Sequence, residues 1–290
     1  MNFPEYFADA EADYKNAEFV LFGVPYGKIS SFRHGVEEAP SALRQASWNF
    51  ETYDLRTGID VEDILVHDYG NLDVDTLSFS EMIQKVHKFT SKIVSEKKFP
   101  VVLGGQHSIT PGIIKAFPSD TAVLFLDAHM DYRERYENSK YNHACAMRRV
   151  ADHVGVRNLA MLGVRSAEKQ EFQDAKKAGI FYRDSFTIRK KGIADAITDT
   201  KKYFGNKKIY LTLDIDVIDP SYAPGTSTPE PFGLTAFDVL EVMESFSSQL
   251  VGFDVVEVCP KYDQGQTAIL AAKLIRLLLS AVWKKNKRKY

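Results

Sequence analysis

The sequence predicts an α/β protein of three layers, in which a parallel sheet of about eight strands lies between two layers of helices. Short apolar runs rich in Val, Ile, Leu and Phe recur along the chain, and several lack polar alternation, as expected for strands buried on both faces. Most gaps between these runs contain amphipathic stretches with helical spacing. Alternating strands and helices favour a parallel sheet, because parallel neighbours need a long crossover connection.

The expected elements follow one another without a linker, an internal repeat or a low-complexity tract, so we expect a single domain covering residues 1–290. The expected strands are Glu18–Gly23, Asp63–Tyr69, Pro100–Leu103, Ala122–Asp127, Asn158–Val164, Gly179–Tyr182, Ile209–Asp214 and Gly252–Val258. The expected helices are Ser80–Glu96, Ser166–Lys177, Ile193–Phe204, Thr235–Ser247 and Gln266–Lys284.

The composition argues against several classes of partner. The 290 residues contain 37 Lys and Arg against 39 Asp and Glu, a balance that suggests neither a nucleic acid nor a membrane surface. The most apolar helix, residues 267–283, is interrupted by Lys273 and Arg276 and is too short to span a membrane comfortably. The two cysteines fit a reducing cytosol as free thiols, although the count alone also allows one disulfide between them. The N-terminal residues show no signal-peptide pattern. We therefore expect a soluble, cytoplasmic protein.

Side chains of the kinds that bind metals follow three of the expected strands. They occur in residues 104–107 (Gly-Gly-Gln-His), 127–131 (Asp-Ala-His-Met-Asp) and 214–216 (Asp-Ile-Asp). Alternate residues of an extended segment point the same way, and ligands of parallel sheets bind at the carboxyl ends of the strands. We therefore expect six side chains to converge: His107, Asp127, His129, Asp131, Asp214 and Asp216.

Four buried aspartates need compensating cations, and neither aspartate motif contains Lys or Arg. A lone Asp-x-Asp is usually a turn or cap feature, but two such motifs and His107, all after buried strands, favour metal binding. Carboxylates and imidazoles without a thiolate suit Mn²⁺ better than structural zinc. Two ions about 3.5–4 Å apart would use all six ligands and supply a bridging hydroxide nucleophile. The residues thus predict two Mn²⁺ per chain.

These motifs resemble those of a known family. Residues 104–108, 127–131 and 214–220 are similar to the three signatures of the ureohydrolase family, which includes arginases and agmatinases. Residues 223–230 resemble the loop that follows the third signature, and the likeness extends in order over nearly the whole chain. The resemblance implies an arginase-like fold, hydrolysis of a C–N bond in a guanidino group, and a homo-oligomer, either a trimer or a hexamer.

The resemblance also implies roles for individual residues. Asp127 and Asp214 would bridge the two ions, and Asp216 would also hydrogen-bond the hydroxide. The first Mn²⁺ would be bound by His107, Asp127, Asp131 and Asp214, and the second by Asp127, His129, Asp214 and Asp216.

Two further residues match the family's catalytic set. Glu257 matches the glutamate that binds the guanidinium group, and a cation beside two metal ions needs such a carboxylate partner. Its alternative reading is a rim residue paired with Lys261. His143 matches a histidine at the mouth of the site that protonates the leaving amine. Alternatively, His143 is a noncatalytic residue at the start of a helix. Arg165 and Ser166 follow an expected strand and are expected near the substrate tail, and helix capping is an equal alternative for Ser166.

The substrate is predicted from residues 132–143, which lack the Ser/Asn-Gly-Asn type of loop that holds the amino and carboxylate groups of arginine in arginases. The segment resembles agmatinases more closely. The expected reaction is hydrolysis of agmatine to putrescine and urea, a step of polyamine biosynthesis. Arg133 or Arg135 could instead hold a carboxylate, so guanidinobutyrase and arginase remain alternatives. A zinc deacetylase of the related fold is less favoured, because it needs fewer carboxylates.

Overall fold

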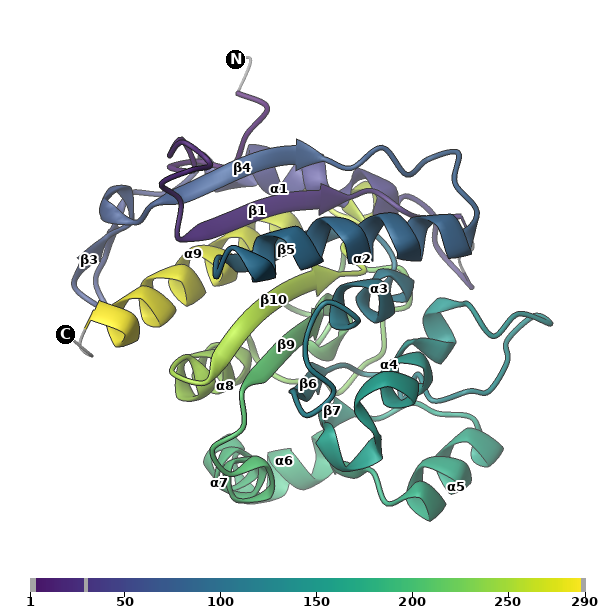
Figure 1. Ribbon diagram of the computed structural model, residues 1–290. Coiled ribbons are helices and arrows are strands. Elements are labelled where there is room, and N and C mark those ends of the chain that lie inside the picture. The colour runs from purple at the N-terminus through teal and green to yellow at the C-terminus, as the bar shows by residue number, and fades with distance from the viewer. Residues whose placement is uncertain (1–3, 29–30, 288–290) are drawn as a thin grey trace.

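The computed structural model describes residues 4–28 and 31–287. Its middle layer is an eight-stranded sheet in which every neighbouring pair of strands is parallel, which confirms the predicted fold class (Figure 1). Across the sheet, the strands are β4 (Val66–Asn71), β1 (Phe19–Val24), β5 (Phe99–Gly104), β10 (Leu250–Val256), β9 (Ile209–Asp214), β6 (Ala122–Leu126), β7 (Leu159–Val164) and β8 (Phe181–Asp184).

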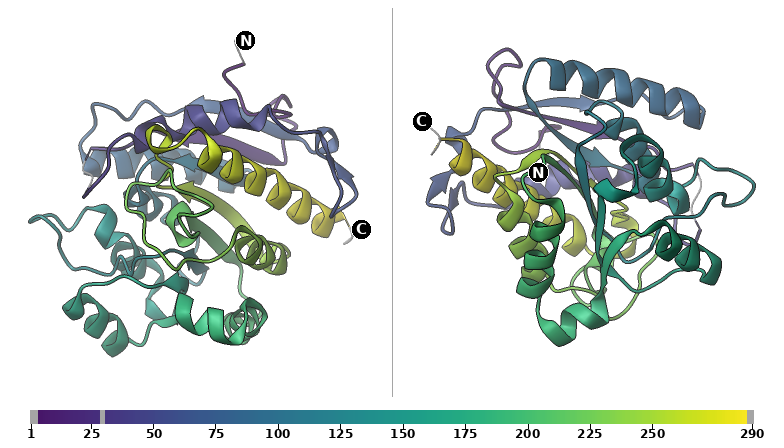
Figure 2. Two further views of the ribbon diagram at one scale, coloured as in Figure 1. Left: turned by 180° about the vertical axis from the view of Figure 1, so that it is seen from behind. Right: turned by 60° about the horizontal axis from the view of Figure 1, so that its bottom comes forward.

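Helices cover both faces of this sheet and form a separate apolar core on each (Figure 2). The helices of one face pack in the sequence α1, α9, α8, α7 and α6, and α2, α3 and α4 pack in a row on the other face with α5 beside them. Their bounds are α1 (Ala39–Ser47), α2 (Phe79–Ser95), α3 (Thr110–Ile114), α4 (Ala146–Val154), α5 (Lys169–Ala178), α6 (Ser185–Lys191), α7 (Ile193–Phe204), α8 (Ala236–Phe246) and α9 (Gln266–Lys287).

All eight expected strands and all five expected helices occur, with shifted ends at most of them. Helix α5 begins at Lys169 rather than Ser166, and Glu171 in its first turn accepts a hydrogen bond at 3.0 Å from the backbone N–H of Glu168, the residue before the helix. Helices α1, α3, α4 and α6 were not expected, and neither was the short hairpin of β2 (Tyr53–Asp54) and β3 (Ile59–Asp60). These elements are short, and α3 reads Thr-Pro-Gly-Ile-Ile, which gives little helical periodicity.

Strand register brings distant parts of the chain to one edge of the sheet. Leu126 of β6 pairs with Leu213 of β9, so the residues that follow, Asp127 and Asp214, lie on adjacent strand ends. On the other side of β9, Asp214 pairs with Val256 of β10. The carboxyl ends of four central strands therefore meet at one place, where the loops after them carry the predicted ligands.

Helix α9 is long and apolar enough, by length and composition, to cross a membrane. However, 72% of its most apolar window is buried inside the protein, which is the pattern of a core helix. Its Arg276 is 1% exposed and pairs with Asp9, so even the charge that interrupts the apolar sequence has a partner within the fold.

Candidate active site

The first group of predicted ligands surrounds the imidazole of His107, which begins a turn of 3-10 helix (His107–Ile109) after β5. Its Nδ1 atom lies 3.1 Å from Oδ2 of Asp127, 3.3 Å from Oδ2 of Asp214 and 3.4 Å from Oδ2 of Asp131. All four side chains are buried. One imidazole nitrogen and three carboxylate oxygens thus converge on one point, and they belong to the four residues that the family resemblance implied for the first ion.

The second group shares Asp127 with the first. Nδ1 of His129 lies 2.8 Å from Oδ2 of Asp216 and 3.9 Å from Oδ1 of Asp127. Each of the two groups, His107–Asp127–Asp214 and Asp127–His129–Asp216, has ligand atoms within 4.8 Å of one another. The structure therefore places two candidate cation sites side by side, with Asp127 between them.

Local hydrogen bonds orient these carboxylates. Oδ1 of Asp127 accepts from the backbone N–H of His129 at 2.7 Å, and Oδ1 of Asp214 accepts from that of Asp216 at 2.9 Å. In each case the loop uses one oxygen and leaves Oδ2 facing the other ligands. Asp131 has a left-handed backbone with φ of 47°, which is uncommon for a residue with a side chain.

The electrostatics of the cluster fit bound cations. Nδ1 of His107 and Oδ2 of Asp127 are buried and make no aligned hydrogen bond within the described part of the chain. Burial and neighbouring carboxylates raise the pKa of Asp131 and Asp214 well above the usual range. Burial lowers the pKa of His107, but Asp127 and Asp131 outweigh it and raise that pKa to about 9. Without cations the cluster must hold protons, and divalent ions in their place satisfy the same atoms.

Glu257 follows β10 and lies beside the metal-type ligands. It is 4% exposed and has a left-handed backbone with φ of 63°. Its Oε1 accepts from the backbone N–H of His107 at 2.7 Å, and its Oε2 accepts from the Ser227 hydroxyl. Lys261, its alternative partner, pairs instead with Glu38 at 2.6 Å. The carboxylate is therefore fixed by uncharged donors and can still receive a cationic ligand.

His143 opens a 3-10 turn (His143–Cys145) before α4 and lies at the mouth of the cluster. Its Nε2 is 2.8 Å from Oγ of Ser31, and its ring meets that of Tyr136 edge-on with centroids 5.9 Å apart. Burial lowers its pKa, so the imidazole is neutral at neutral pH. A neutral histidine that faces the site can accept a proton and return it.

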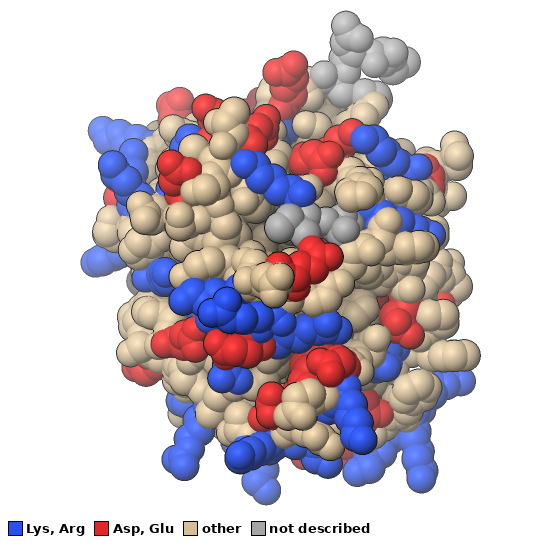
Figure 3. All heavy atoms as spheres, turned by 90° about the vertical axis from the view of Figure 1, so that its right-hand side faces the viewer, with Lys and Arg blue, Asp and Glu red and all other residues tan. Residues whose placement is uncertain are grey.

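A pocket of about 250 Å³ opens onto these groups. Figure 3 looks onto the edge of the sheet where the strands end, and acidic and basic side chains are mixed on that face. His107 and Asp127 are buried behind the residues that line the pocket, namely Ser31, His129, Asp131, Arg133, Tyr136, His143, Ala144, Ser166, Ala167, Glu171, Asp214, Asp216, Thr228 and Glu257.

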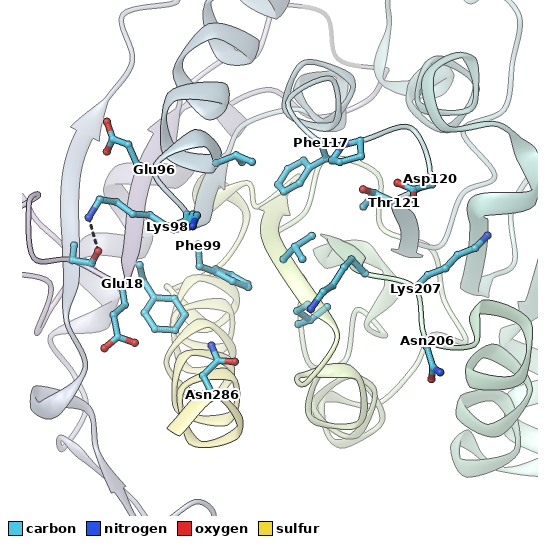
Figure 4. A pocket seen from close by; sticks show the side chains of 18 residues that line it. Glu18, Glu96, Lys98, Phe99, Phe117, Asp120, Thr121, Asn206, Lys207 and Asn286 are labelled. Atoms are coloured by element: carbon cyan, nitrogen blue, oxygen red, sulfur yellow. Dashed lines mark hydrogen bonds between the residues drawn. The ribbon is translucent and has the colours of Figure 1, made fainter. Parts of the chain in front are cut away.

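A larger hollow of about 780 Å³ lies at the opposite end of the strands (Figure 4). Its walls include Phe99, Phe117 and Lys207, and its Lys98 donates to the backbone carbonyls of Lys15 and Ala17. Neither candidate metal group lies there. The chemistry is therefore at the smaller pocket, where the titratable groups converge.

Several contacts at the site have no signal in the sequence motifs. Arg165 was expected near the substrate tail, but its guanidinium instead donates to backbone carbonyls, including that of Asp216 at 2.7 Å. Glu171 of α5 accepts from the backbone N–H of Tyr132 at 2.8 Å and lies 3.4 Å from Nε of Arg133. Arg165 and Glu171 thus bond the loops around the site, although neither residue lies within one of the three ligand motifs.

The fold and these side chains define a class of protein in which two neighbouring cation sites face a substrate pocket at the carboxyl edge of a parallel sheet. Comparison with known proteins gives the family. Residues 17–280 match the model of the arginase family. The agmatinase of Bacillus anthracis is 31% identical over 280 residues, 94% of each chain.

The N(1)-aminopropylagmatine ureohydrolase of Thermococcus kodakarensis is 34% identical, over 93% of this chain and 92% of that protein. The crystal structure of agmatine ureohydrolase of Thermoplasma volcanium superposes with a TM-score of 0.94 at 37% identity, covering 100% of this chain and 98% of the other. The chain belongs to the arginase family, as its motifs predicted. It is an amidinohydrolase, similar to agmatinases, in a family of binuclear metal hydrolases.

Proposed function

We propose that this protein is a dinuclear manganese enzyme, folded as one domain, that hydrolyses agmatine to putrescine and urea. The observation that carries the proposal is the pair of His/Asp groups joined by Asp127, with the buried carboxylate of Glu257 beside them. A cationic guanidinium group fits a pocket whose innermost side chains are carboxylates.

The chain's residues fit two Mn²⁺ ions, since all donors are carboxylates and imidazoles. When bound, the ions would supply Lewis acidity and a hydroxide nucleophile at neutral pH. Asp127 and Asp214 are proposed as bridging ligands. The first ion would be held by His107, Asp127, Asp131 and Asp214, and the second by Asp127, His129, Asp214 and Asp216.

Three residues are proposed to act on the substrate or on the nucleophile. Glu257 binds the guanidinium N–H groups and fixes the carbon that is attacked, because its own position is set by His107 and Ser227. Asp216, besides serving as a ligand of the second ion, would accept a hydrogen bond from the nucleophile. His143, neutral before the reaction, would take up the proton that the attacking water gives up and pass it to the amine nitrogen as the C–N bond breaks.

One observation favours a second candidate substrate, 4-guanidinobutyrate. The guanidinium of Arg133 lines the pocket and lies 4.8 Å from the ring centre of Tyr136. A carboxylate tail would pair with it, whereas the ammonium tail of agmatine would be repelled unless Glu171, 3.4 Å away, balances the charge. The named relatives and the partial neutralisation of Arg133 by Glu171 support agmatine as the first choice.

The test is release of urea by the purified protein with Mn²⁺ from agmatine, 4-guanidinobutyrate and arginine. We expect the largest kcat/KM with agmatine. Asp127→Asn should abolish activity, and Asp120→Asn, an exposed aspartate at the opposite hollow, should behave as wild type. A preference for 4-guanidinobutyrate would replace the substrate assignment, and absence of urea from all three would overturn the proposed reaction.

We further propose that the protein acts in the cytoplasm as a homo-oligomer, a trimer or a hexamer. Both cysteines are free thiols, which suits a reducing compartment. Light scattering coupled to size-exclusion chromatography tests the assembly, and a monomeric mass would contradict it.

A further inference from the structure

A hydrogen-bonded chain lies behind the ring of His107, on the side opposite the carboxylate cluster. Nε2 of His107 is 3.0 Å from Oγ1 of Thr212, and the Thr212 hydroxyl donates to Oδ1 of Asp254. Thr212 lies on β9 and Asp254 on β10, where they pair directly in register. Both are 0% exposed, so water cannot replace either partner. The two central strands therefore build a fixed polar support under His107.

The direction of these hydrogen bonds follows from the acceptor at the end of the chain. Asp254 accepts from three hydroxyl groups, those of Thr212, of Thr110 at 3.1 Å and of Tyr210 at 2.9 Å. A hydroxyl group carries one proton, so Thr212, having donated to Asp254, can only accept from His107. Nε2 must then carry the ring proton. The other nitrogen, Nδ1, faces Asp127 without an aligned hydrogen bond, and it is the atom whose lone pair would bind a metal ion once its proton has left.

We propose that Thr212 and Asp254 are positioning residues for the first metal ion, because they hold His107 in the tautomer and orientation whose Nδ1 binds that ion. The inference rests on the proposed two-metal site and adds two residues that no ligand motif contains. Metal-bound histidines commonly donate their second N–H to a carboxylate or another acceptor, which fixes the ring and strengthens the ligand. Here the Thr212 hydroxyl accepts from His107 and donates to the carboxylate of Asp254 on the neighbouring strand, so the carboxylate orients the ring through the hydroxyl.

The support is present at one of the two candidate sites. His129, which serves the second group, has a side chain that is 27% exposed, so its ring is open to water. His107 is 1% exposed. Disrupting the hydrogen bonds from His107 through Thr212 to Asp254 should therefore lower the affinity for the first ion and leave the affinity for the second unchanged. A residue that only stabilised the core would affect both sites alike through the fold.

The experiment is a titration of the metal-free protein with Mn²⁺, in which electron paramagnetic resonance measures the free and bound ion. Wild type should bind two ions per chain and show an exchange-coupled signal. Thr212→Val keeps the shape of the side chain and removes the acceptor. It should bind one ion with wild-type affinity and the other about 10–100-fold more weakly, with an uncoupled signal at one ion per chain.

Two matched variants complete the test. Thr212→Ser keeps the hydroxyl group and should bind both ions with wild-type affinity. Tyr210→Phe removes a different donor to Asp254 and leaves Thr212 in place, so it should also bind both ions with wild-type affinity. Asp254→Asn is measured as well, so that a poorly folded Thr212→Val does not decide the matter. Asp254→Asn should lower the affinity for the same ion as Thr212→Val does.

The inference is overturned if Thr212→Val binds both ions as wild type does, or if Tyr210→Phe loses the same ion to the same extent. Failure of the proposed function gives a different result, because wild type itself would then bind fewer than two ions or release no urea.

Discussion

The guanidinium of Arg165 joins the loop that carries Asp216 to the loop after it, and its removal should be costly. Nη2 donates to the carbonyls of Asp216 at 2.7 Å and Glu230 at 2.6 Å. Nε and Nη1 make four further contacts at 3.0–3.2 Å. The carbonyls that accept are those of Gly163, Asp216, Val217, Glu230 and Pro231.

We expect Arg165→Met to lower the free energy of unfolding by about 3–5 kcal/mol. Hydrogen bonds to a charged group contribute about 1.5–3 kcal/mol each, and the two bonds from Nη2 are the shortest. The other four are longer and share donors, and the burial that lowers the pKa of Arg165 offsets part of the gain. Arg165→Lys should lose about half as much, because one ammonium group cannot reach five separated carbonyls.

The assay is urea denaturation of the metal-free proteins followed by circular dichroism, so that metal binding does not add to stability. Arg157→Met is the matched control. Its side chain is exposed, and it should stay within about 0.5 kcal/mol of wild type. Urea release by the Mn²⁺-loaded Arg165→Met should also fall, because the backbone at Asp216 is no longer held. A loss below about 1 kcal/mol for Arg165→Met would refute the reasoning.

Three further predictions concern the site. Neighbouring carboxylates outweigh burial and raise the pKa of His107 and His129 to about 9, so without metal both rings are imidazolium cations at neutral pH. To bind either ring, Mn²⁺ must displace the proton from the nitrogen that becomes its ligand. Mn²⁺ affinity should therefore rise from about pH 6 to about pH 9, with proton release in calorimetry, and a flat profile would contradict this. Burial raises the pKa of Cys145 to about 11 and of Cys259 to about 12, so both thiols should resist alkylation at neutral pH until urea unfolds the protein. Arg133→Gln should lower KM for agmatine and raise it for 4-guanidinobutyrate, each by about fivefold, as expected for about 1 kcal/mol of charge interaction. Equal effects on both substrates would exclude a role in selectivity.

Much of the architecture could be predicted because its signals are local. Buried parallel strands leave continuous apolar runs, as in β1, β6 and β7, and even the half-buried edge strands β4 and β8 lie where apolar residues predicted them. Helices with a long amphipathic pattern, such as Ile193–Phe204, were predicted to the residue. Helix α4 was missed although its nine residues do carry an amphipathic pattern, with Ala146, Met147, Val150 and Val154 buried at helical spacing. Helix α3 has only five residues and depends on packing against its neighbours.

The candidate site shows the same division. Residues 127–131 and 214–216 could be recognised from their residue types and their position after buried strands, although the backbone there is not extended throughout, since Asp131 has a φ of 47° and Ile215–Val217 form a 3-10 helix. Glu257 and His143 were identified by resemblance, and the structure brings both to the pocket. The hydrogen bonds that hold Glu257 join residues 150 and 30 positions apart, and no local pattern encodes them.

By itself, the sequence determined which side chains would follow the strand ends, and their combined charge predicted bound cations. Only the tertiary structure decided which strand ends are neighbours. The order β5, β10, β9 and β6 places His107, Glu257, Asp214 and Asp127 at adjacent positions, although 150 residues separate the first two. It also decided that the Thr212 hydroxyl lies beside His107 and that the Arg165 guanidinium donates to backbone carbonyls. Side-chain direction is a property of a few residues, whereas strand order and hydrogen-bond partners follow from packing the whole chain around its core.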